Sequence, residues 1–386
     1  MLRCNILTIF LAFSLLAGAQ DWKVVREHPQ KAFPKTVAAG NYSGIAHLHD
    51  DIYAVVSDKS DSALYFNFRI QVNPKTGELE QVENLGFTER TDETLNDGKP
   101  WQVQEKGFDH EAIVKVSDST LVIASEGYCR LKEYSILHTS ADAAKIGYSQ
   151  NLWESRWPSS DFYPNYNFES LAFDSIRQYL WTIPESTLRK DGQPATPQNG
   201  LANQLRLMRL DWGKIKENRN KEDNGKEDSS EQVSSKKDSR YMTTYAYQMD
   251  QPSTHKKADI YVMGVSELCA LPDGQLLVLE REAFIPKIKI GAFCKCKLYQ
   301  INPLNSEEFA MKEKFSSDTP FLKKKLLVEW KTGLSLSKRS FANYEGMCLG
   351  PKLEDGSQVV ILLSDSQDQY AGVLRDWFKT IVIRKE

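Results

Sequence analysis

One pattern recurs five times in this chain and limits the possible folds more than any other feature. Each copy has a small or acidic motif, a short apolar strand, a turn, and a second apolar strand that ends in an acidic residue. The copies span residues 42–58, 109–126, 167–185, 265–280 and 343–365. Strand–turn–strand units repeated along one chain are typical of a β-propeller, in which every blade is an antiparallel sheet.

Turn chemistry and composition agree with this architecture. Pro272-Asp273-Gly274 and Glu354-Asp355-Gly356 place a glycine where a hairpin turn needs a positive φ. Aromatic residues, which pack well in strands, make up 11% of the chain. A propeller blade usually takes about 40 to 50 residues, so six blades of roughly 60 residues fit with long insertions. We predict an all-β fold, a six-bladed β-propeller; a β-sandwich or two β domains remain the alternatives.

The N-terminal segment has the pattern of a secretory signal peptide. A basic start at Arg3 precedes an apolar run over 6–16, and Ala17-Gly18-Ala19 provides a small-x-small cleavage site. No lipid-bearing Cys follows this site, and no other stretch is apolar enough to span a bilayer. We therefore predict a signal peptide at 1–19, a single propeller domain over 20–386, and a secreted or periplasmic protein.

The charges of the chain are numerous but nearly balanced. Lys and Arg total 49 against 52 Asp and Glu, and this balance argues against nucleic acid as a partner. One stretch, 213–240, consists almost entirely of Lys, Glu, Asp, Asn and Ser. Because such a stretch cannot bury enough apolar surface to offset the entropy lost on ordering, we predict a disordered insertion between two strands.

Five cysteines lie beyond the signal segment, and an odd number cannot all pair within one chain. They are Cys129, Cys269, Cys294, Cys296 and Cys348. The strand spacing of Cys294 and Cys296 predicts that both sulfurs point to one face. A zinc site would need two more soft ligands, and the sequence has no second C-x-C or C-x-x-C motif. Structural cysteines are the favoured interpretation, and a zinc site is the alternative.

The repeated modules carry acidic residues at two equivalent positions. Inner strands of a propeller run along its central channel, so equivalent positions converge on one axis. One set opens the inner strands: Glu111, Glu169, Glu267 and Glu345. The other ends the following strands: Asp58, Glu126, Glu185, Glu280 and Asp365. We predict that the first set surrounds the axis with at least some of the second nearby.

Carboxylates crowded around one axis repel each other, and shared protons or a bound cation relieve the repulsion. Oxygen-only ligands favour Ca²⁺, which accepts six to eight oxygens in irregular geometry. We therefore predict a Ca²⁺ site built from the two acidic sets. The structural alternative is that these side chains accept hydrogen bonds from backbone amides at the ends of the blades.

Other catalytic templates find little support. His110, beside Glu111, is a candidate general acid, although a lone His more often has a structural role. Residues 264–268 lack the final Gly of a G-x-S-x-G elbow. No phosphate-binding glycine loop or dinucleotide fingerprint occurs.

The five modules together resemble the phytase-like family, described by an esterase-like activity of phytase. The motifs that carry the resemblance are 43–46 with 57–58, 109–113 with 125–127, 168–172 with 185, 264–268 with 279–281, and 343–347 with 364–365. Two positions depart from the family pattern. Ala112 stands where the family commonly has Gly, and 364–368 is polar where the family often has Asp-Asn-Asn-Phe.

The resemblance implies an exported β-propeller that hydrolyses small-molecule phosphate esters. On such a scaffold Ca²⁺ would screen the acidic residues from the phosphate and polarise a bound water. We predict catalytic roles for Glu111, Glu267, Glu345 and Arg281, and phosphate contacts for Arg281 and Lys59. Two alternatives remain: a non-catalytic propeller that binds a ligand or glycan, and a lactonase-like, metal-dependent propeller hydrolase. The substrate and the oligomeric state do not follow from the sequence.

Overall fold

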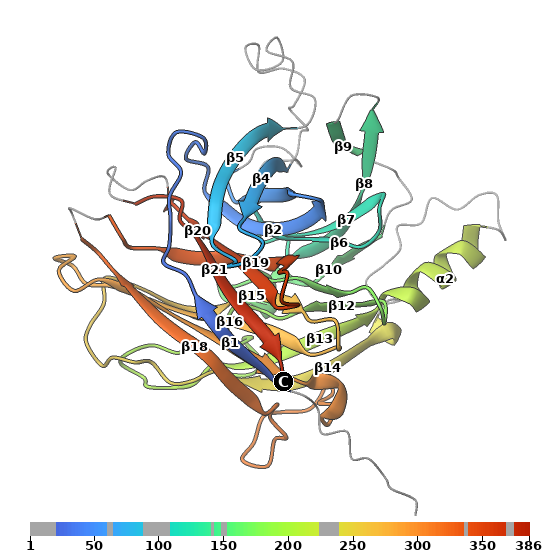
Figure 1. Cartoon of the computed structure of the whole chain (residues 1–386). Coiled ribbons are helices and arrows are strands. Elements are labelled where there is room, and N and C mark those ends of the chain that lie inside the picture. Colours follow the sequence, from blue (N-terminus) through green and yellow to red (C-terminus); the bar gives the residue numbers. More distant parts are fainter. Residues whose placement is uncertain are drawn as a thin grey trace, which may run out of the picture.

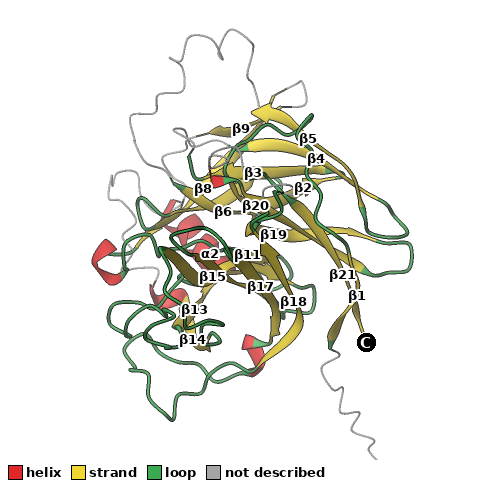
Figure 2. Cartoon of the chain, turned by 90° about the vertical axis from the view of Figure 1, so that its left-hand side faces the viewer, coloured by secondary structure: helices red, strands yellow, loops and turns green. Residues whose placement is uncertain are grey.

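The computed structural model describes residues 21–59, 65–87, 109–139, 143–147, 153–223, 239–335, 339–367 and 374–386. The predicted signal peptide, 1–19, lies outside the described residues. The described strands form five antiparallel sheets arranged around a common centre (Figures 1 and 2). Each sheet is one blade of a β-propeller, and we number the blades in the chain order of their innermost strands.

Blade 1 contains β2 (Tyr42–His49), β3 (Ile52–Ser57), β4 (Phe66–Val72) and β5 (Leu79–Phe87). Blade 2 contains β6 (His110–Lys115), β7 (Thr120–Ser125), β8 (Arg130–Thr139) and β10 (Glu154–Arg156), and β9 (Ala143–Gly147) also pairs with β8. Blade 3 contains β11 (Ala172–Asp174), β12 (Tyr179–Thr182), β13 (Gln204–Asp211) and β14 (Met242–Gln248).

Blade 4 contains β15 (Ile260–Ala270), β16 (Leu276–Ile285), β17 (Phe293–Ile301) and β18 (Lys324–Gly333). Blade 5 contains β19 (Asn343–Lys352), β20 (Gln358–Asp365), β21 (Phe378–Lys385) and β1 (Trp22–Glu27). Strand β1 pairs antiparallel with β21, with Trp22 opposite Lys385. The two ends of the chain therefore close the last blade together.

The innermost strands contact one another in a closed ring. In order these strands are β2, β6, β11, β15 and β19, and β19 contacts β2 again. Glycines allow this close approach: a Cβ on Gly44 would lie 2.7 Å from the Cα of Ala112, and one on Gly346 would lie 2.6 Å from the carbonyl oxygen of Ser43. Neighbouring inner strands therefore touch backbone to backbone.

The propeller prediction is confirmed, and each of the five sequence modules supplies the first two strands of a different blade. The prediction of six blades is not confirmed. Among the described residues, the ring closes with five sheets. The extra length that suggested a sixth blade goes into connections between strands, such as the segment that joins β13 to β14.

Alternating side chains pack each blade between its two neighbours. Every residue of β20 is buried, because this strand lies inside its sheet and has another blade on either face. Val360 and Leu362 pack into the same apolar cluster as Leu279 of blade 4. Ile361 points the other way and packs into the cluster of Val55 in blade 1. Burial of each such aliphatic side chain contributes about 1.5–3 kcal/mol.

Helix α2 (Trp212–Asp223) follows β13 directly and projects from the side of the ring (Figure 1). Trp212 and Ile215 are buried in the core between blades 2 and 3, and the Arg219 guanidinium lies 2.7 Å from the carboxylate of Glu133. These contacts make the first part of the predicted disordered insertion helical instead. The rest of that insertion, 224–238, lies outside the described residues.

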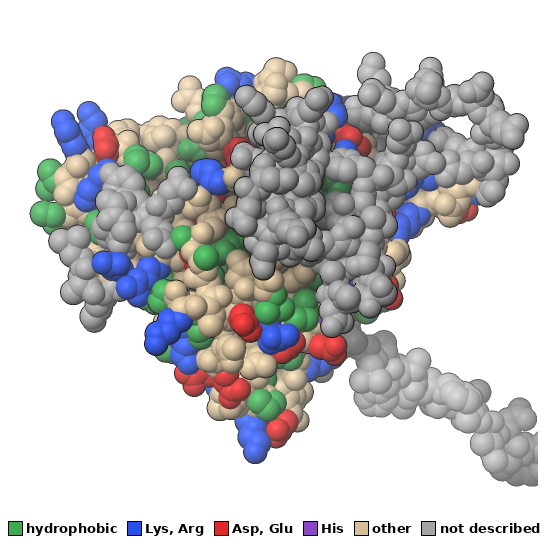
Figure 3. Space-filling view, turned by 90° about the horizontal axis from the view of Figure 1, so that it is seen from above, with side chains coloured by type: hydrophobic (Ala, Val, Ile, Leu, Met, Phe, Trp, Pro, Cys, Tyr) green, Lys and Arg blue, Asp and Glu red, His purple; other side chains and the backbone are tan. Residues whose placement is uncertain are grey.

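Three short 3₁₀ turns complete the described secondary structure: η1 (Ser159–Asp161), η2 (Ser239–Tyr241) and η3 (Pro303–Asn305). Among the described residues, no helix is long and apolar enough to cross a membrane. Acidic and basic side chains are interspersed over the described part of the face in Figure 3, as the nearly balanced composition predicts.

Candidate functional site

The register of the hairpins brings both acidic sets to one end of the ring. In blade 2, His110 at the start of β6 pairs with Ser125 at the end of β7. In blade 5, Asn343 at the start of β19 pairs with Asp365 at the end of β20. Antiparallel pairing thus places the first residue of an inner strand beside the last residue of the next strand. We call this end of the propeller the acidic mouth.

Arg281 of β16 lies at the centre of one half of the acidic mouth. Its Nη2 donates to Glu169 Oε2 at 3.1 Å and to Glu185 Oε1 at 2.5 Å. Its Nη1 donates to Asn343 Oδ1 at 3.1 Å and to the carboxylate of Glu345. Arg281 and the carboxylates of Glu169, Glu185 and Glu345 form what we call the arginine cluster, which joins blades 3, 4 and 5.

The arginine cluster is a buried group of charges. Burial alone would lower the pKa of Arg281, but the carboxylates of Glu169, Glu345 and Glu185 raise this pKa well above its usual value. The guanidinium therefore stays charged, and both Nη groups donate to side chains of the protein itself. A phosphate contact by Arg281 would require a guanidinium with N–H groups open to the substrate, whereas here both Nη groups donate to side chains of the protein.

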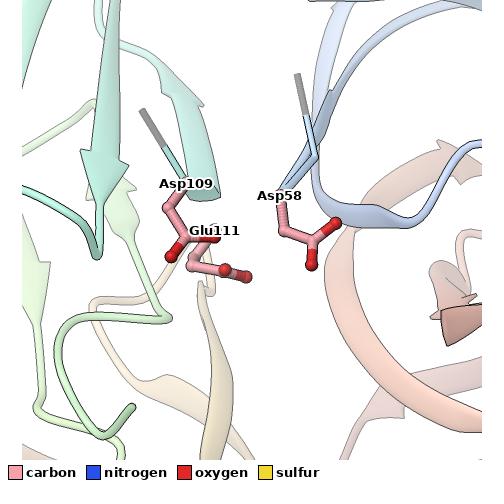
Figure 4. A group of neighbouring side chains, drawn as sticks. All are labelled: Asp58, Asp109 and Glu111. Atoms are coloured by element: carbon pink, nitrogen blue, oxygen red, sulfur yellow. The ribbon is translucent and has the colours of Figure 1, made fainter. Parts of the chain in front are cut away.

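Three further carboxylates face one another across blades 1 and 2 (Figure 4). Asp58 directly follows β3, Asp109 directly precedes β6, and Glu111 is the second residue of β6. One carboxylate oxygen from each lies within 4.8 Å of the others. We call these residues the acidic triad; Glu111 is buried, and the other two are half-buried.

Asp109 is absent from the two acidic sets predicted from the sequence. The sequence signal for it is an Asp two residues before Glu111. Asp109 directly precedes β6 and has a φ of +47°, so strand alternation does not describe its position. The sequence prediction took one acidic residue from the start of each inner strand, and it therefore omitted Asp109. Among the described residues, the acidic triad is the one group of three or more potential metal-ligating side chains this close together.

Burial raises the pKa values of the carboxyl groups around the acidic triad, and nearby like charges raise those of Glu111 and Asp365 further. The pKa of Glu111 is well above its usual value because of burial and the nearby Glu345, Asp58 and Asp109. The pKa of Asp109 is also raised, first by burial. Burial, Glu345 and Asp58 raise the pKa of Asp365 in the same way. These groups favour a proton or a cation.

Glu126 of blade 2 and Glu345 of the arginine cluster are two further carboxyl groups with raised pKa values. Burial and the charge of Glu185 raise the pKa of Glu126 to about 7, and its Oε1 accepts a hydrogen bond from the backbone N–H of Asn167 at 3.2 Å. Burial raises the pKa of Glu345 to about 7 as well, even though Arg281 lowers it. Both groups therefore exchange protons near neutral pH.

Lys59 places an ammonium group at the rim of the mouth. Its side chain is 56% exposed, and it pairs with the carboxylate of Asp58. Burial alone would lower the pKa of Lys59, but this pairing raises it above its usual value. Lys59 is thus charged, solvent-accessible and adjacent to the acidic triad, as a contact with an anionic substrate requires.

Two predicted ligands lie apart from the converging carboxylates. Glu267 is buried, and its Oε1 accepts hydrogen bonds from the backbone N–H groups of Leu171 and Leu268, both at 2.9 Å. The carboxylate of Glu280 accepts hydrogen bonds from the Tyr247 hydroxyl and the Lys324 ammonium, both at 2.7 Å. Glu267 matches the structural alternative, in which the carboxylate satisfies backbone amides.

Glu280 is directed away from the mouth by strand geometry. It precedes Arg281 on β16, and successive side chains of a strand point to opposite faces of the sheet. Arg281 points toward the carboxylates of the acidic mouth, so Glu280 points to the other face of blade 4, where Tyr247 and Lys324 lie.

His110 and the cysteines occupy buried structural positions. His110 Nδ1 lies 2.9 Å from Ser125 Oγ, and burial lowers the pKa of His110 to about 3, so the ring is neutral at pH 7. The cysteines 129, 269, 294, 296 and 348 are free and buried. The sulfurs of Cys294 and Cys296 lie 3.9 Å apart, which confirms that they share a face.

A known family accounts for most of the chain, including this site. The family model described as "Phytase-like: Esterase-like activity of phytase" matches residues 37–367. The chain belongs to the phytase-like family. The match covers all five inner strands and both halves of the acidic mouth. None of the curated proteins compared with this phytase-like chain matches it.

Solved structures share only a remote likeness with this phytase-like propeller. A streptogramin B lyase has 10% sequence identity and a TM-score of 0.33, with coverage of 92% of this chain and 98% of the lyase. The Dos1 propeller has 10% identity and a TM-score of 0.27, with coverage of 88% and 68%. The Hadza microbial sialidase Hz136 has 10% identity and a TM-score of 0.28, with coverage of 89% and 70%. Likenesses this low carry no functional argument.

Proposed function

We propose that this phytase-like propeller is a Ca²⁺-dependent hydrolase of phosphate monoesters that works at its acidic mouth. The observation that carries the proposal is the acidic triad, whose three carboxylates from two blades lie within 4.8 Å of one another. Three carboxylates offer only oxygen ligands, and oxygens in irregular arrangement suit Ca²⁺ better than Zn²⁺. The family description, an esterase-like activity of phytase, supports the same reaction class.

The acidic triad fits a cation better than the arginine cluster does. In the arginine cluster, the guanidinium of Arg281 already balances part of the negative charge. In the triad, burial and like charge raise the pKa of Glu111, so the site gains from any cation that enters. Asp58, Asp109 and Glu111 would hold the ion, with Asp365 and Glu126 close enough to add to the field.

Hydrolysis requires a water oxygen to attack phosphorus, the P–O ester bond to break, and the alcohol to leave with a proton. Bound Ca²⁺ would supply charge neutralisation and polarisation of a water. Among the residues of the chain, Glu126 is suited to accept the proton of that water, because its pKa of about 7 matches a general base at neutral pH. Lys59, exposed at the rim, is suited to contact a phosphate oxygen.

A substrate screen tests the proposal directly. The full chain is incubated with p-nitrophenyl phosphate, inositol hexakisphosphate and a panel of sugar lactones, with Ca²⁺ or with EDTA. We expect phosphate release that stops in EDTA and returns when Ca²⁺ is added in excess. Turnover of lactones alone would favour the lactonase-like alternative. Stabilisation by Ca²⁺ without any turnover would favour a propeller that binds a ligand or glycan.

We also propose that the protein acts outside the cytoplasm. The support is the signal-peptide pattern at 1–19, with its small residues ahead of Gln20. N-terminal sequencing of the protein from an exporting host should begin at Gln20. A mature chain that still begins at Met1 would contradict this proposal.

A further inference from the structure

The hairpin between β16 and β17 ends in exposed isoleucines and lysines. We call residues 286–291, Pro-Lys-Ile-Lys-Ile-Gly, the hairpin tip. Ile288 is 73% exposed and Ile290 is 80% exposed. Ile260, which begins β15 opposite Ile285, is 49% exposed. Burying such side chains is favourable, so a surface that displays them together calls for an explanation.

A well-packed base holds the hairpin tip in place. Phe284 and Phe293 are buried and stack with ring centroids 5.2 Å apart, and the ammonium of Lys331 lies 3.8 Å from the ring centroid of Phe293. Within the tip, the backbone N–H of Lys289 donates to the carbonyl of Pro286 at 2.8 Å. The exposed isoleucines therefore stand on an ordered turn.

The hairpin tip lies at the same end of the propeller as the acidic mouth. Strand β16 continues four residues beyond Arg281, to Ile285, which corresponds to about 13 Å at the usual rise of a strand. Figure 1 shows β18, the outer strand of this blade, running toward the left edge of the molecule. Blade 4 thus extends beyond the mouth and carries the tip at its end.

The charges around the exposed isoleucines are mainly basic. Lys287 is exposed beside Ile288, and Lys289 separates the two isoleucines. Lys256 and Lys257 are exposed on the segment that leads into β15. Asp259 is the acidic side chain of this segment, and it lies 3.5 Å from the Lys289 ammonium. The surface is therefore apolar at its tip and cationic around it.

We propose that the hairpin tip docks this protein onto an anionic lipid surface, a role that goes beyond the proposed hydrolase activity and does not depend on it. Ile288 and Ile290 would enter the boundary between headgroups and acyl chains, and the lysines would lie at the level of the anionic headgroups.

The shape of the tip favours a membrane over a protein partner. A stable protein interface usually buries about 800 Å² on each side, which two isoleucines on a projecting turn do not offer. A lipid surface accepts a convex, apolar tip without a complementary groove. The lysines add attraction that depends on anionic lipid and on salt.

Vesicle sedimentation tests this inference. The full chain, in EDTA so that Ca²⁺ does not bridge acidic groups and lipid, is mixed with vesicles of phosphatidylcholine alone or of phosphatidylcholine and phosphatidylglycerol in equal parts. We expect at least about tenfold tighter binding to the anionic vesicles, and weaker binding at high salt, as for a surface that combines apolar insertion with basic residues.

Two variants and a matched control locate the binding surface. I288S/I290S should reduce binding to anionic vesicles by about tenfold or more, and K287Q/K289Q by several-fold, since each removes one of the two contributions. I176S is the control: Ile176 is 69% exposed, but it lies in the β11–β12 turn, at the end of the propeller opposite the mouth. I176S should bind like the unmodified chain.

Three results would overturn the inference. The first is equal binding to both kinds of vesicle, and the second is unchanged binding by I288S/I290S. The third is a concentration-dependent dimer that I288S/I290S abolishes, seen by analytical ultracentrifugation without lipid, because the occupant of the tip would then be a second copy of the chain. Circular dichroism of each variant establishes that it is folded.

Discussion

The two halves of the acidic mouth differ in how the negative charges of their carboxylates are balanced. In the arginine cluster, the guanidinium of Arg281 lies among three carboxylates from blades 3 and 5. In the acidic triad, Asp58, Asp109 and Glu111 face one another, and Lys59 pairs with Asp58 from the rim. The first half contains a buried cation of the chain itself, whereas the second has only the exposed Lys59 beside it and gains more from an external cation. This difference indicates which half is structural and which is suited to bind.

Removal of the guanidinium should have the largest effect. Arg281→Ala leaves the buried Glu169, Glu185 and Glu345 without their cation, and breaking a buried ion pair typically costs about 3–5 kcal/mol. Urea denaturation should show this loss, and the added substitution Glu185→Gln should recover part of it. Arg384→Ala, which breaks an exposed pair with Asp355, is the control and should cost about 1 kcal/mol or less. If Arg281→Ala is as stable as the parent and lacks only activity, the structural role is wrong and Arg281 contacts the phosphate, as the sequence predicted.

The pH dependence of stability tests the raised pKa values of the acidic mouth without mutation. Glu126 and Glu345 have folded-state pKa values raised from 4.5 to about 7. A raised pKa of a carboxyl group means that the folded state binds protons more tightly than the unfolded state does. In EDTA, the stability that these groups contribute should be fully present below pH 4.5 and be lost as pH rises through 7. The loss for each group is up to about 1.4 kcal/mol for every tenfold difference in proton affinity between the two states.

Calcium should reduce this loss of stability, because it favours the ionised carboxylates over the protonated ones. Thermal melts from pH 5 to 8, in EDTA and in Ca²⁺, make the measurement. Curves for the two conditions that run parallel over the whole range would contradict a cation site at these carboxylates.

A single amide substitution should then distinguish the triad from the other acidic residues. Asp109→Asn removes one of three charges from the proposed site, so we expect Ca²⁺ affinity to fall by about tenfold, or about 1.4 kcal/mol, in isothermal titration. In EDTA the same variant should be slightly more stable than the parent, because one repulsive charge is gone. Glu280→Gln, on the opposite face of β16, is the matched control and should bind Ca²⁺ normally.

Glu267→Gln extends this comparison to a predicted ligand that the structure places elsewhere. Its carboxylate accepts backbone N–H groups from Leu171 and Leu268, so the substitution should leave Ca²⁺ affinity unchanged. A fall in affinity equal to that of Asp109→Asn would show that Glu267 belongs to the cation site after all.

The smallest effect should come from the rim. Lys59→Gln breaks an exposed pair with Asp58, and such pairs contribute about 0–1 kcal/mol to stability. If Lys59 contacts a phosphate oxygen of the substrate, KM should rise several-fold with kcat nearly unchanged, since the contact would be present in both ground and transition states. Steady-state kinetics with p-nitrophenyl phosphate make the test, and an unchanged KM would exclude the contact.

Most of the acidic residues selected from the sequence lie at the acidic mouth, and the reason is local. Turn positions and strand alternation are local, so the sequence of one module is enough to place Glu111 at the start of β6 and Glu126 just after β7. Because every module follows the same order, the acidic residues had to gather at one mouth once the modules formed a ring. The convergence of Glu169 and Glu345 follows from the same repetition.

Asp109 and Glu267 show where the local pattern stops being sufficient. Asp109 directly precedes β6 and joins the acidic triad. Glu267 lies deep within the longer strand β15, and its carboxylate accepts a hydrogen bond from the backbone N–H of Leu171, which precedes β11. Whether a carboxylate joins other carboxylates or accepts backbone N–H groups depends on which of these partners lies near it. That proximity depends on how closely inner strands approach across the axis, which a single module does not encode.

By itself, the sequence of this protein determined the strand pairs, their turns, the propeller architecture and the acidic end, because these depend on residues close together in the chain. Only the tertiary structure decided that five sheets close the ring among the described residues, with β1 completing blade 5. It also decided that Arg281 reaches Glu169 and Glu345, residues 112 and 64 positions away. These outcomes depend on packing between blades, which brings together residues that are distant in sequence. Burial and charge then determine which of these residues pair.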